Sequence, residues 1–246
     1  MSDRPVALVT GAGSGIGRAA ALAFAARGAA VVAADIDADA ARETAALVAE
    51  STSVQADVAV ARDVEAMVAH ALERFGRLDW AFNNAGITTP PRRTAELDEA
   101  DWDRVIAVDL KGVWLCMKYE IPALLRTRGA IVNMSSMWGL VGFHNSTAAY
   151  IASKHGVLGL TRAAALEYAT DGLRVNAVCP GAIHTEGLEA RLAREPDSRT
   201  KLAAWAPLER LGTPAEVAEA VVWLCSDAAR FITGQALPVD GGYTAR

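Results

Sequence analysis

The sequence predicts an α/β fold: a single domain with a doubly wound parallel sheet of seven strands and helices on both faces. Short, apolar, β-branched runs alternate with longer helical stretches, which is the pattern of βαβ units. The runs are apolar throughout, as expected for strands that are covered on both faces. No Pro/Gly/Ser-rich linker and no internal repeat divides the 246 residues, a length that one large core can hold.

The first half of the chain predicts four strands with helices between them. Runs rich in valine favour strands, and a glycine-rich turn after the first run favours the start of a helix. The second helical stretch is rich in alanine, the residue with the highest helix propensity. The strands are expected at residues 6–9, 30–34, 53–56 and 78–82, and the helices at 15–27, 38–50 and in a stretch that ends near Phe75.

The second half predicts three more strands. A long helix is expected to begin near Asp101, to run past Leu115 and to end before Arg128, and a further helix carries Tyr150 and Lys154 and ends near Tyr168. The remaining elements are strands at 130–134, 173–179 and 235–239 and a helix at 214–224.

Two segments look like loops, 88–94 with its two prolines and 184–205. The second follows the end of a strand, so residues 185–205 are expected to form a lid over a substrate.

Composition and charge narrow the possible functions. The hydrophobic content of 52% indicates a packed interior, and a net charge of −5 argues against nucleic acid as a main partner. We find no apolar run of membrane-spanning length and no signal peptide. Cys116, Cys179 and Cys225 are far apart and lack metal-ligand spacing, so we expect reduced core cysteines, no metal site and a cytoplasmic location.

The turn after the first strand, Thr10 to Gly17, has the spacing T-G-x-x-x-G-x-G. Glycines allow the backbone to approach a ligand closely, and the start of the following helix offers free amide groups to a pyrophosphate. Between a strand and a helix, this turn predicts a dinucleotide site.

Asp35 ends the second strand and predicts which dinucleotide is bound. A carboxylate there can accept hydrogen bonds from both adenosine ribose hydroxyls and repels a 2′-phosphate. Ser14 is neutral, and no basic residue directly follows Asp35. We therefore expect NAD to be preferred over NADP by at least ~10-fold. A solvated carboxylate at the strand end is the alternative interpretation.

Tyr150 and Lys154 are four residues apart, so they share one face of a helix. A neighbouring cation lowers the pKa of a phenol from its usual ~10 toward neutrality, which makes the phenol useful as an acid or base. The spacing alone is common by chance, and it gains weight from the other motifs.

Six motifs occur in order along the chain: Thr10-Gly11 through Gly17, Asp57-Val58, Asn83-Asn84-Ala85-Gly86, Ser136, Tyr150-x-x-x-Lys154 and Pro180-Gly181. Together they resemble the motifs of the classical short-chain dehydrogenase/reductase family over the whole length. The resemblance implies one NAD-binding, Rossmann-type catalytic domain over residues 1–246.

The resemblance also implies the roles of individual residues. Tyr150 exchanges a proton with the substrate oxygen, Ser136 hydrogen-bonds that oxygen, and Lys154 lowers the pKa of the phenol and holds the nicotinamide ribose. The 83–86 motif also suits a tight turn, and Pro180-Gly181 also suits a strand end. The implied cofactor-binding residues are Gly11, Ser14, Gly15, Ile16, Gly17, Asp35, Ile36, Asp57, Val58, Asn83, Ala85, Gly86, Tyr150, Lys154, Pro180, Gly181, Ile183 and Thr185.

Asp109 departs from the family pattern. It stands before Leu110-Lys111-Gly112, where the family usually has an asparagine that helps to fix a water chain to the lysine. An aspartate keeps the acceptor but loses the amide donor, so we expect Asp109 to replace the asparagine structurally.

The substrate residues suggest a moderately apolar cleft that can hold a ring, and by analogy with the family a secondary alcohol, with cyclic alcohols as candidates. A 3-oxoacyl-thioester reductase and a catalytically silent dinucleotide-binding or scaffold protein are the alternatives. A homo-oligomer, by resemblance a tetramer, is expected from apolar residues on the helices at 102–118 and around Tyr150. The expected substrate residues are Ser136, Met137, Trp138, His144, Asn145, Leu188 and Trp205, with Ile87 nearby.

Overall fold

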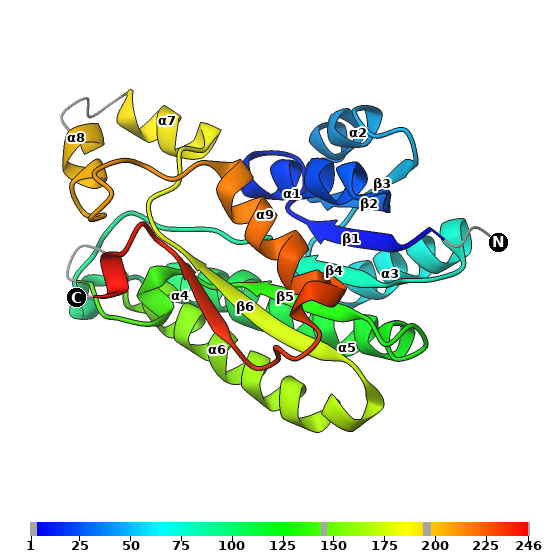
Figure 1. Cartoon of the computed structure of the whole chain (residues 1–246). Helices are drawn as coiled ribbons and strands as arrows, with labels where there is room; N and C mark the ends of the chain where they lie inside the picture. The colour runs from blue at the N-terminus through cyan, green and yellow to red at the C-terminus, as the bar shows by residue number, and fades with distance from the viewer. Residues whose placement is uncertain (1–3, 144–146, 194–197, 246) are drawn as a thin grey trace.

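A computed structural model describes residues 4–143, 147–193 and 198–245 and confirms the predicted α/β fold (Figure 1). Seven parallel strands form one sheet in the order β3-β2-β1-β4-β5-β6-β7. The strands are β1 (Val6–Thr10), β2 (Ala30–Asp35), β3 (Ser51–Gln55), β4 (Trp80–Asn83), β5 (Ala130–Met134), β6 (Arg174–Pro180) and β7 (Ala236–Val239).

Helices cover both faces of the sheet because successive strand residues point to opposite sides and both sides are apolar. The helices are α1 (Gly15–Ala26), α2 (Ala38–Ala46), α3 (Ala61–Phe75), α4 (Glu99–Ile106), α5 (Val113–Leu124), α6 (Ala148–Glu167), α7 (Glu186–Leu192), α8 (Ser198–Ala203) and α9 (Pro214–Cys225). In β5, for example, Ile131 packs into the core beneath α3, α5 and α6, whereas Val132 packs into the core beneath α1 and α9 (Figure 1). None of the helices in the described ranges is long and apolar enough to cross a bilayer.

The strand order reverses between β1 and β4. The chain leaves β1 toward β2 and β3 on one side, and continues from β4 toward β7 on the other. Ligands of such sheets bind outside the carboxyl ends of the strands at this point of reversal. Thr10, Asp35, Asn83 and Ser136 all lie at or just beyond strand ends on this edge, so the fold gathers the predicted site residues there.

Three expectations about individual elements are corrected. The helix expected at 38–50 ends at Ala46, because the Ser51 hydroxyl donates to the carbonyls of Ala45 and Val48 and closes the chain into β3. The long helix after Asp101 is interrupted by a π-helical segment, Ala107–Gly112, between α4 and α5. The 184–205 segment is not a plain loop, because α7 and α8 form within it and the Thr185 hydroxyl caps α7 by accepting from the Leu188 amide.

A buried polar group lies beneath the carboxyl edge of the sheet. Glu120 on α5 is fully buried and accepts a hydrogen bond from the Asn83 side-chain amide, with 3.1 Å between Nδ2 and Oε2. Burial raises the pKa of Glu120 to about 8, although the Asn83 bond lowers it in part. Among the described residues, Glu120 Oε1 and Asn83 Oδ1 have no hydrogen-bond partner. A neutral acid leaves no unpaired negative charge in this buried environment, and a proton on Oε1 makes that oxygen a donor.

Replacing Glu120 by glutamine is expected to remove a pH-dependent loss of stability. The folded protein binds the proton up to a pH of about 8, whereas the unfolded chain releases it near 4.5, so this contribution is complete at low pH and is lost as the pH rises through 8. From about pH 6 to about pH 9, the wild-type protein should lose ~3 kcal/mol of unfolding free energy relative to the variant. Denaturant unfolding at both pH values measures this.

Glu219→Gln, on the exposed side of α9, is the matched control, and its unfolding free energy should follow the wild-type pH dependence. Equal pH dependence in wild type and Glu120→Gln would contradict a protonated Glu120.

Candidate active site

The turn between β1 and α1 brings backbone amides to the carboxyl edge of the sheet. Gly15 adopts a positive φ of 52°, which side chains disfavour. Gly17 lets the helix approach the turn, since a Cβ at this position would lie 1.9 Å from the Gly11 carbonyl oxygen. Gly17 therefore acts through packing, which keeps the start of α1, with its backbone amides, close to the turn.

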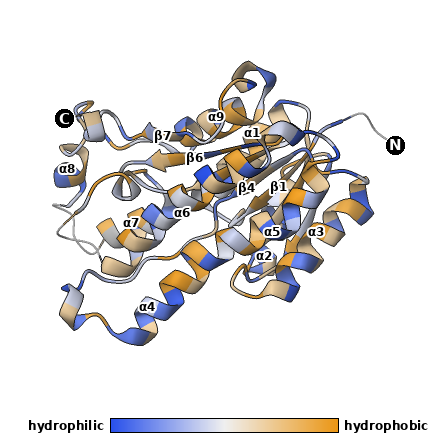
Figure 2. Ribbon diagram, turned by 90° about the horizontal axis from the view of Figure 1, so that it is seen from below, coloured by the Kyte–Doolittle hydropathy of each residue, from blue (hydrophilic) through white to orange (hydrophobic). Residues whose placement is uncertain are grey.

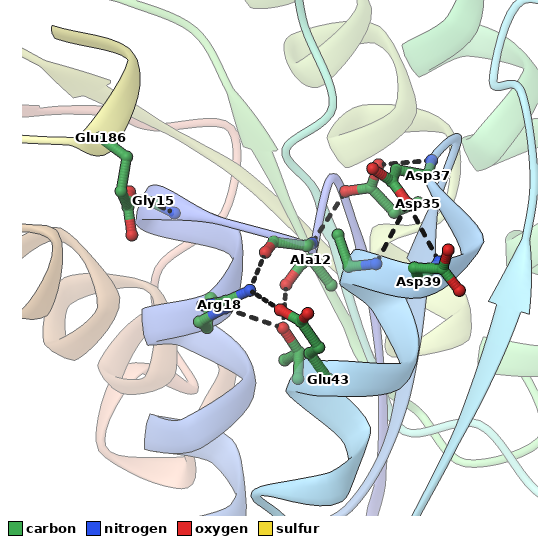
Figure 3. A network of polar contacts seen from close by, with 11 residues as sticks. Ala12, Gly15, Arg18, Asp35, Asp37, Asp39, Glu43 and Glu186 are labelled. Carbon is green, nitrogen blue, oxygen red and sulfur yellow. Dashed lines mark hydrogen bonds and ion pairs between the residues drawn. The ribbon is translucent and has the colours of Figure 1, made fainter. Parts of the chain in front are cut away.

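Side chains of Arg18, Thr44 and Asn84 form hydrogen bonds to the backbone carbonyls of the β1–α1 turn. Arg18 donates to the Gly13 carbonyl and to the Thr44 hydroxyl, which itself donates to the Ala12 carbonyl at 2.8 Å (Figure 3). Asn84 donates from its side-chain amide to the carbonyls of Thr10 and Gly11 at 2.9 and 3.1 Å. The phosphate-binding turn is thus fixed before any ligand binds.

The Asp35 carboxylate lies at the end of β2 with both oxygens oriented by backbone amides. Oδ2 accepts from Gly13 at 2.8 Å and Oδ1 accepts from Asp37 at 3.0 Å (Figure 3). Asp35 lines a cavity of about 420 Å³, and no lysine or arginine is among its lining residues. The lining residues include Gly11, Ser14, Gly15, Ile16, Ile36, Asp57, Val58, Asn84, Ala85, Gly86 and Thr185.

A second carboxylate, that of Glu186 at the start of α7, reaches the N-terminus of α1. Its Oε2 accepts from the Gly15 amide at 3.0 Å (Figure 3). A helix N-terminus favours negative charge, and here a side chain supplies it. An anionic group that binds at this amide must displace Glu186.

An adjoining cavity of about 480 Å³ contains the predicted catalytic residues Ser136, Tyr150 and Lys154. It shares Ile16, Asn84 and Thr185 with the cavity above Asp35, so the two are continuous. The other lining residues include Gly86, Ile87, Pro180, Gly181, Ile183, Thr185 and Leu188.

Helix α6 positions the tyrosine and the lysine. Its N-cap, Thr147, accepts from the Tyr150 amide, so the helix starts just before the phenol. Lys154 lies one turn later, with its Nζ 5.3 Å from the centroid of the Tyr150 ring. The positive charge of Lys154 therefore lies beside the phenol ring.

The neighbouring serines Ser135 and Ser136 make different contacts. Ser135 donates to the Lys154 backbone carbonyl at 2.9 Å and fixes β5 to α6. Ser136 accepts from the Trp138 amide at 3.2 Å, which leaves its own hydroxyl proton free for another acceptor. This arrangement favours Ser136 for contact with a substrate oxygen.

Lys154 is held in a buried polar environment. Its Nζ lies 3.0 Å from Asp109 Oδ2 and donates to the Met134 carbonyl at 3.3 Å. Burial acts to lower the pKa of the ammonium, but the nearby Asp109 and Tyr150 outweigh burial and raise it above its usual value. Lys154 is therefore a stable cation beside the phenol.

Aromatic side chains form a wall next to Tyr150. Trp138 stacks on Phe143 with 4.6 Å between centroids, and its ring meets Tyr150 edge-on at 6.2 Å. Trp205 packs against Phe143 at 4.9 Å and lies 6.4 Å from Tyr243. A further cavity of about 250 Å³ beside this wall is lined by Met137, Leu202 and Trp205 among others.

The structure brings together most, but not all, of the predicted site residues. The Asn83 side chain points away from both cavities toward Glu120 and Asn133, and the adjacent Asn84 lines them instead. Sequence reasoning also missed Phe143 and Tyr243, which are distant in sequence and carry no motif. The predicted substrate residues His144 and Asn145 lie outside the described residues.

The chain is similar in sequence and in structure to known oxidoreductases. A family model described as enoyl-(acyl carrier protein) reductase matches residues 11–244. The chain is 46% identical over 249 residues to cyclohexanol dehydrogenase of Acinetobacter sp. (strain SE19). The aligned region covers 99% of this chain and 96% of that protein. It is 47% identical to cis-4-hydroxycyclohexanecarboxylate dehydrogenase of Sinomonas cyclohexanicum, over 98% and 96% of the two chains. The crystal structure of levodione reductase matches with a TM-score of 0.93, 36% identity and 98% coverage of both chains.

Proposed function

The chain belongs to the short-chain dehydrogenase/reductase family, and we propose that it is an NAD(H)-dependent oxidoreductase that interconverts a secondary alcohol and its ketone. One observation carries the proposal. Ser136, Tyr150 and Lys154 line a cavity that is continuous with the phosphate-binding turn of α1. A dinucleotide along the turn would therefore present its reactive end beside the phenol.

In alcohol oxidation, Tyr150, Lys154 and Ser136 each have a separate role. Tyr150 takes the proton from the substrate hydroxyl, and Lys154 beside it favours the phenolate that can do so. Ser136 donates a hydrogen bond to the substrate oxygen and stabilises the charge that develops there. When bound, the nicotinamide supplies the chemistry of hydride transfer. In ketone reduction Tyr150 returns the proton.

Asp35 supports NAD over NADP as the cofactor. Its carboxylate is held at the mouth of the cavity by the amides of Gly13 and Asp37, where a ribose diol would lie. A 2′-phosphate there would face this negative charge, with no lysine or arginine among the cavity-lining residues to offset it.

A cyclic secondary alcohol is the substrate class that we favour. The wall formed by Trp138, Phe143 and Trp205 makes the surroundings of Tyr150 apolar and aromatic, which suits a ring better than a charged substrate. Two relatives, a cyclohexanol dehydrogenase and a cis-4-hydroxycyclohexanecarboxylate dehydrogenase, support the same substrate class. The description of the family model favours a second candidate, a reductase of acyl thioesters.

A coupled screen tests the proposal. Cyclic and acyclic secondary alcohols with NAD, and ketones and a 3-oxoacyl thioester with NADH, are followed by nicotinamide absorbance. We expect the highest kcat/KM for a cyclic alcohol with NAD. Preference for the thioester would favour the second candidate. Cofactor binding without turnover of any compound would favour a catalytically silent dinucleotide-binding protein.

We also propose that the protein forms a homo-oligomer and that it works in the cytoplasm. Trp102 on α4 and Trp114 on α5 are 40% and 44% exposed, and Figure 2 shows that α4 projects from the sheet. Such exposed apolar surface supports a homo-oligomer, a tetramer by the family resemblance. The three free, buried cysteines support a reducing compartment, the cytoplasm.

A further inference from the structure

The π-helical segment between α4 and α5 carries a buried carboxylate into the active site. Asp109 is completely buried, its Oδ1 accepts from the Ile87 amide at 2.8 Å, and its Oδ2 lies 3.0 Å from the Lys154 Nζ. A Cβ at Gly86 would lie 3.1 Å from that Oδ2 and 3.4 Å from Nζ. The carboxylate is therefore fixed at both oxygens, and a glycine leaves space for the ion pair.

We propose that Asp109 is a positioning residue that sets the pH at which Tyr150 ionises: its carboxylate holds the Lys154 ammonium in place and offsets part of its charge. The phenol therefore ionises at a higher pH than it would with a neutral side chain at position 109. This inference rests on the proposed role of Tyr150 as acid and base.

The electrostatic reasoning starts from Lys154. An isolated ammonium 5.3 Å from the Tyr150 ring would stabilise the phenolate. With a carboxylate 3.0 Å from that ammonium, the phenol faces an ion pair whose two charges partly cancel. The same carboxylate keeps Lys154 protonated, because it raises the pKa of the ammonium against the effect of burial.

The other groups around Lys154 in the described structure carry no charge that would counteract the Asp109 carboxylate. Within the described part of the chain, Cys179 on β6 is the remaining ionisable group that acts on Lys154. Burial raises the pKa of Cys179 to about 11, so the thiol is neutral over the working range. The β5 group that contacts Nζ is the uncharged Met134 carbonyl. Asp109 is thus the negative charge that opposes Lys154 at Tyr150.

Titration of Tyr150 in the cofactor-free protein tests the inference directly. Tyrosinate absorbance of each variant is measured against pH, and the same protein carrying Tyr150→Phe is subtracted to remove the other three tyrosines. We expect Asp109→Asn and Asp109→Ser to shift the Tyr150 titration to lower pH by about one unit. Asp109→Glu keeps the charge and should stay closer to wild type. The pH profile of kcat/KM for alcohol oxidation should move in the same direction.

Asp79→Asn is the matched control, since Asp79 is a buried carboxylate paired with Arg77 at the opposite end of β4. It should lower stability without moving the Tyr150 titration. An unchanged or alkaline-shifted titration in both neutral Asp109 variants would overturn the proposal. If neither variant folds, the wild-type titration decides: a pKa within about one unit of 10 supports partial cancellation, and one below about 8 overturns it. Failure of the proposed function would appear separately, as cofactor binding by the wild-type protein without turnover of any alcohol or ketone.

Discussion

Replacing Tyr150 by phenylalanine is expected to lower kcat for alcohol oxidation by at least ~10²-fold. The change removes only the hydroxyl that exchanges a proton with the substrate, whereas the ring keeps its edge-on contact with Trp138 and its place beside Lys154. Steady-state rates with NAD and a cyclic secondary alcohol measure the loss. Cofactor affinity should change much less, because the variant keeps the turn, Asp35 and Lys154.

Tyr168→Phe is the matched control. Tyr168 follows α6 at its opposite end and packs against the core, so the same chemical change occurs away from the cavities. This variant should keep the wild-type kcat. A Tyr150→Phe variant within a few-fold of wild type would show that another group transfers the proton.

Asp35→Ala is expected to have the second largest effect, on cofactor choice. The ratio of kcat/KM with NAD to kcat/KM with NADP should fall by at least ~10-fold, equivalent to ~1.4 kcal/mol of discrimination. The variant loses the acceptor for the ribose hydroxyls and also the charge that repels a 2′-phosphate. Kinetics with each cofactor at a fixed alcohol concentration measure the ratio.

Asp37→Ala removes an equal charge only two residues away and serves as the control. The Asp37 carboxylate caps α2 by accepting from the amides of Asp39 and Ala40, so its loss should weaken the helix start and leave the cofactor ratio near wild type. Unchanged discrimination in Asp35→Ala would show that its carboxylate is only a solvated strand end.

Local patterns in the sequence predicted much of this protein. The alternation of apolar runs and helical stretches predicted the seven-stranded sheet, and the spacing of glycines predicted the turn at the start of α1. The four-residue spacing predicted that Tyr150 and Lys154 share a helix face. These patterns are readable because they act between residues that are close along the chain.

Packing between distant elements decided the rest. Neither the ion pair of Asp109 with Lys154 nor the wall of Trp138, Phe143 and Trp205 has a sequence pattern, because each depends on how separate elements meet. The sequence predicted one continuous helix there and gave no sign of the π-helical turn that carries Asp109 toward Lys154.

The neighbours Asn83 and Asn84 show the division most clearly. The sequence by itself determined that an amide-rich turn follows β4 at the edge where ligands bind. Successive residues at a strand end point in opposite directions, so one amide enters the core and the other faces the cavity. Only the tertiary structure decided which of the two asparagines enters the core. The buried Glu120 and Asn133 accept hydrogen bonds from the Asn83 amide, so Asn83 lies in the core and Asn84 holds the phosphate-binding turn.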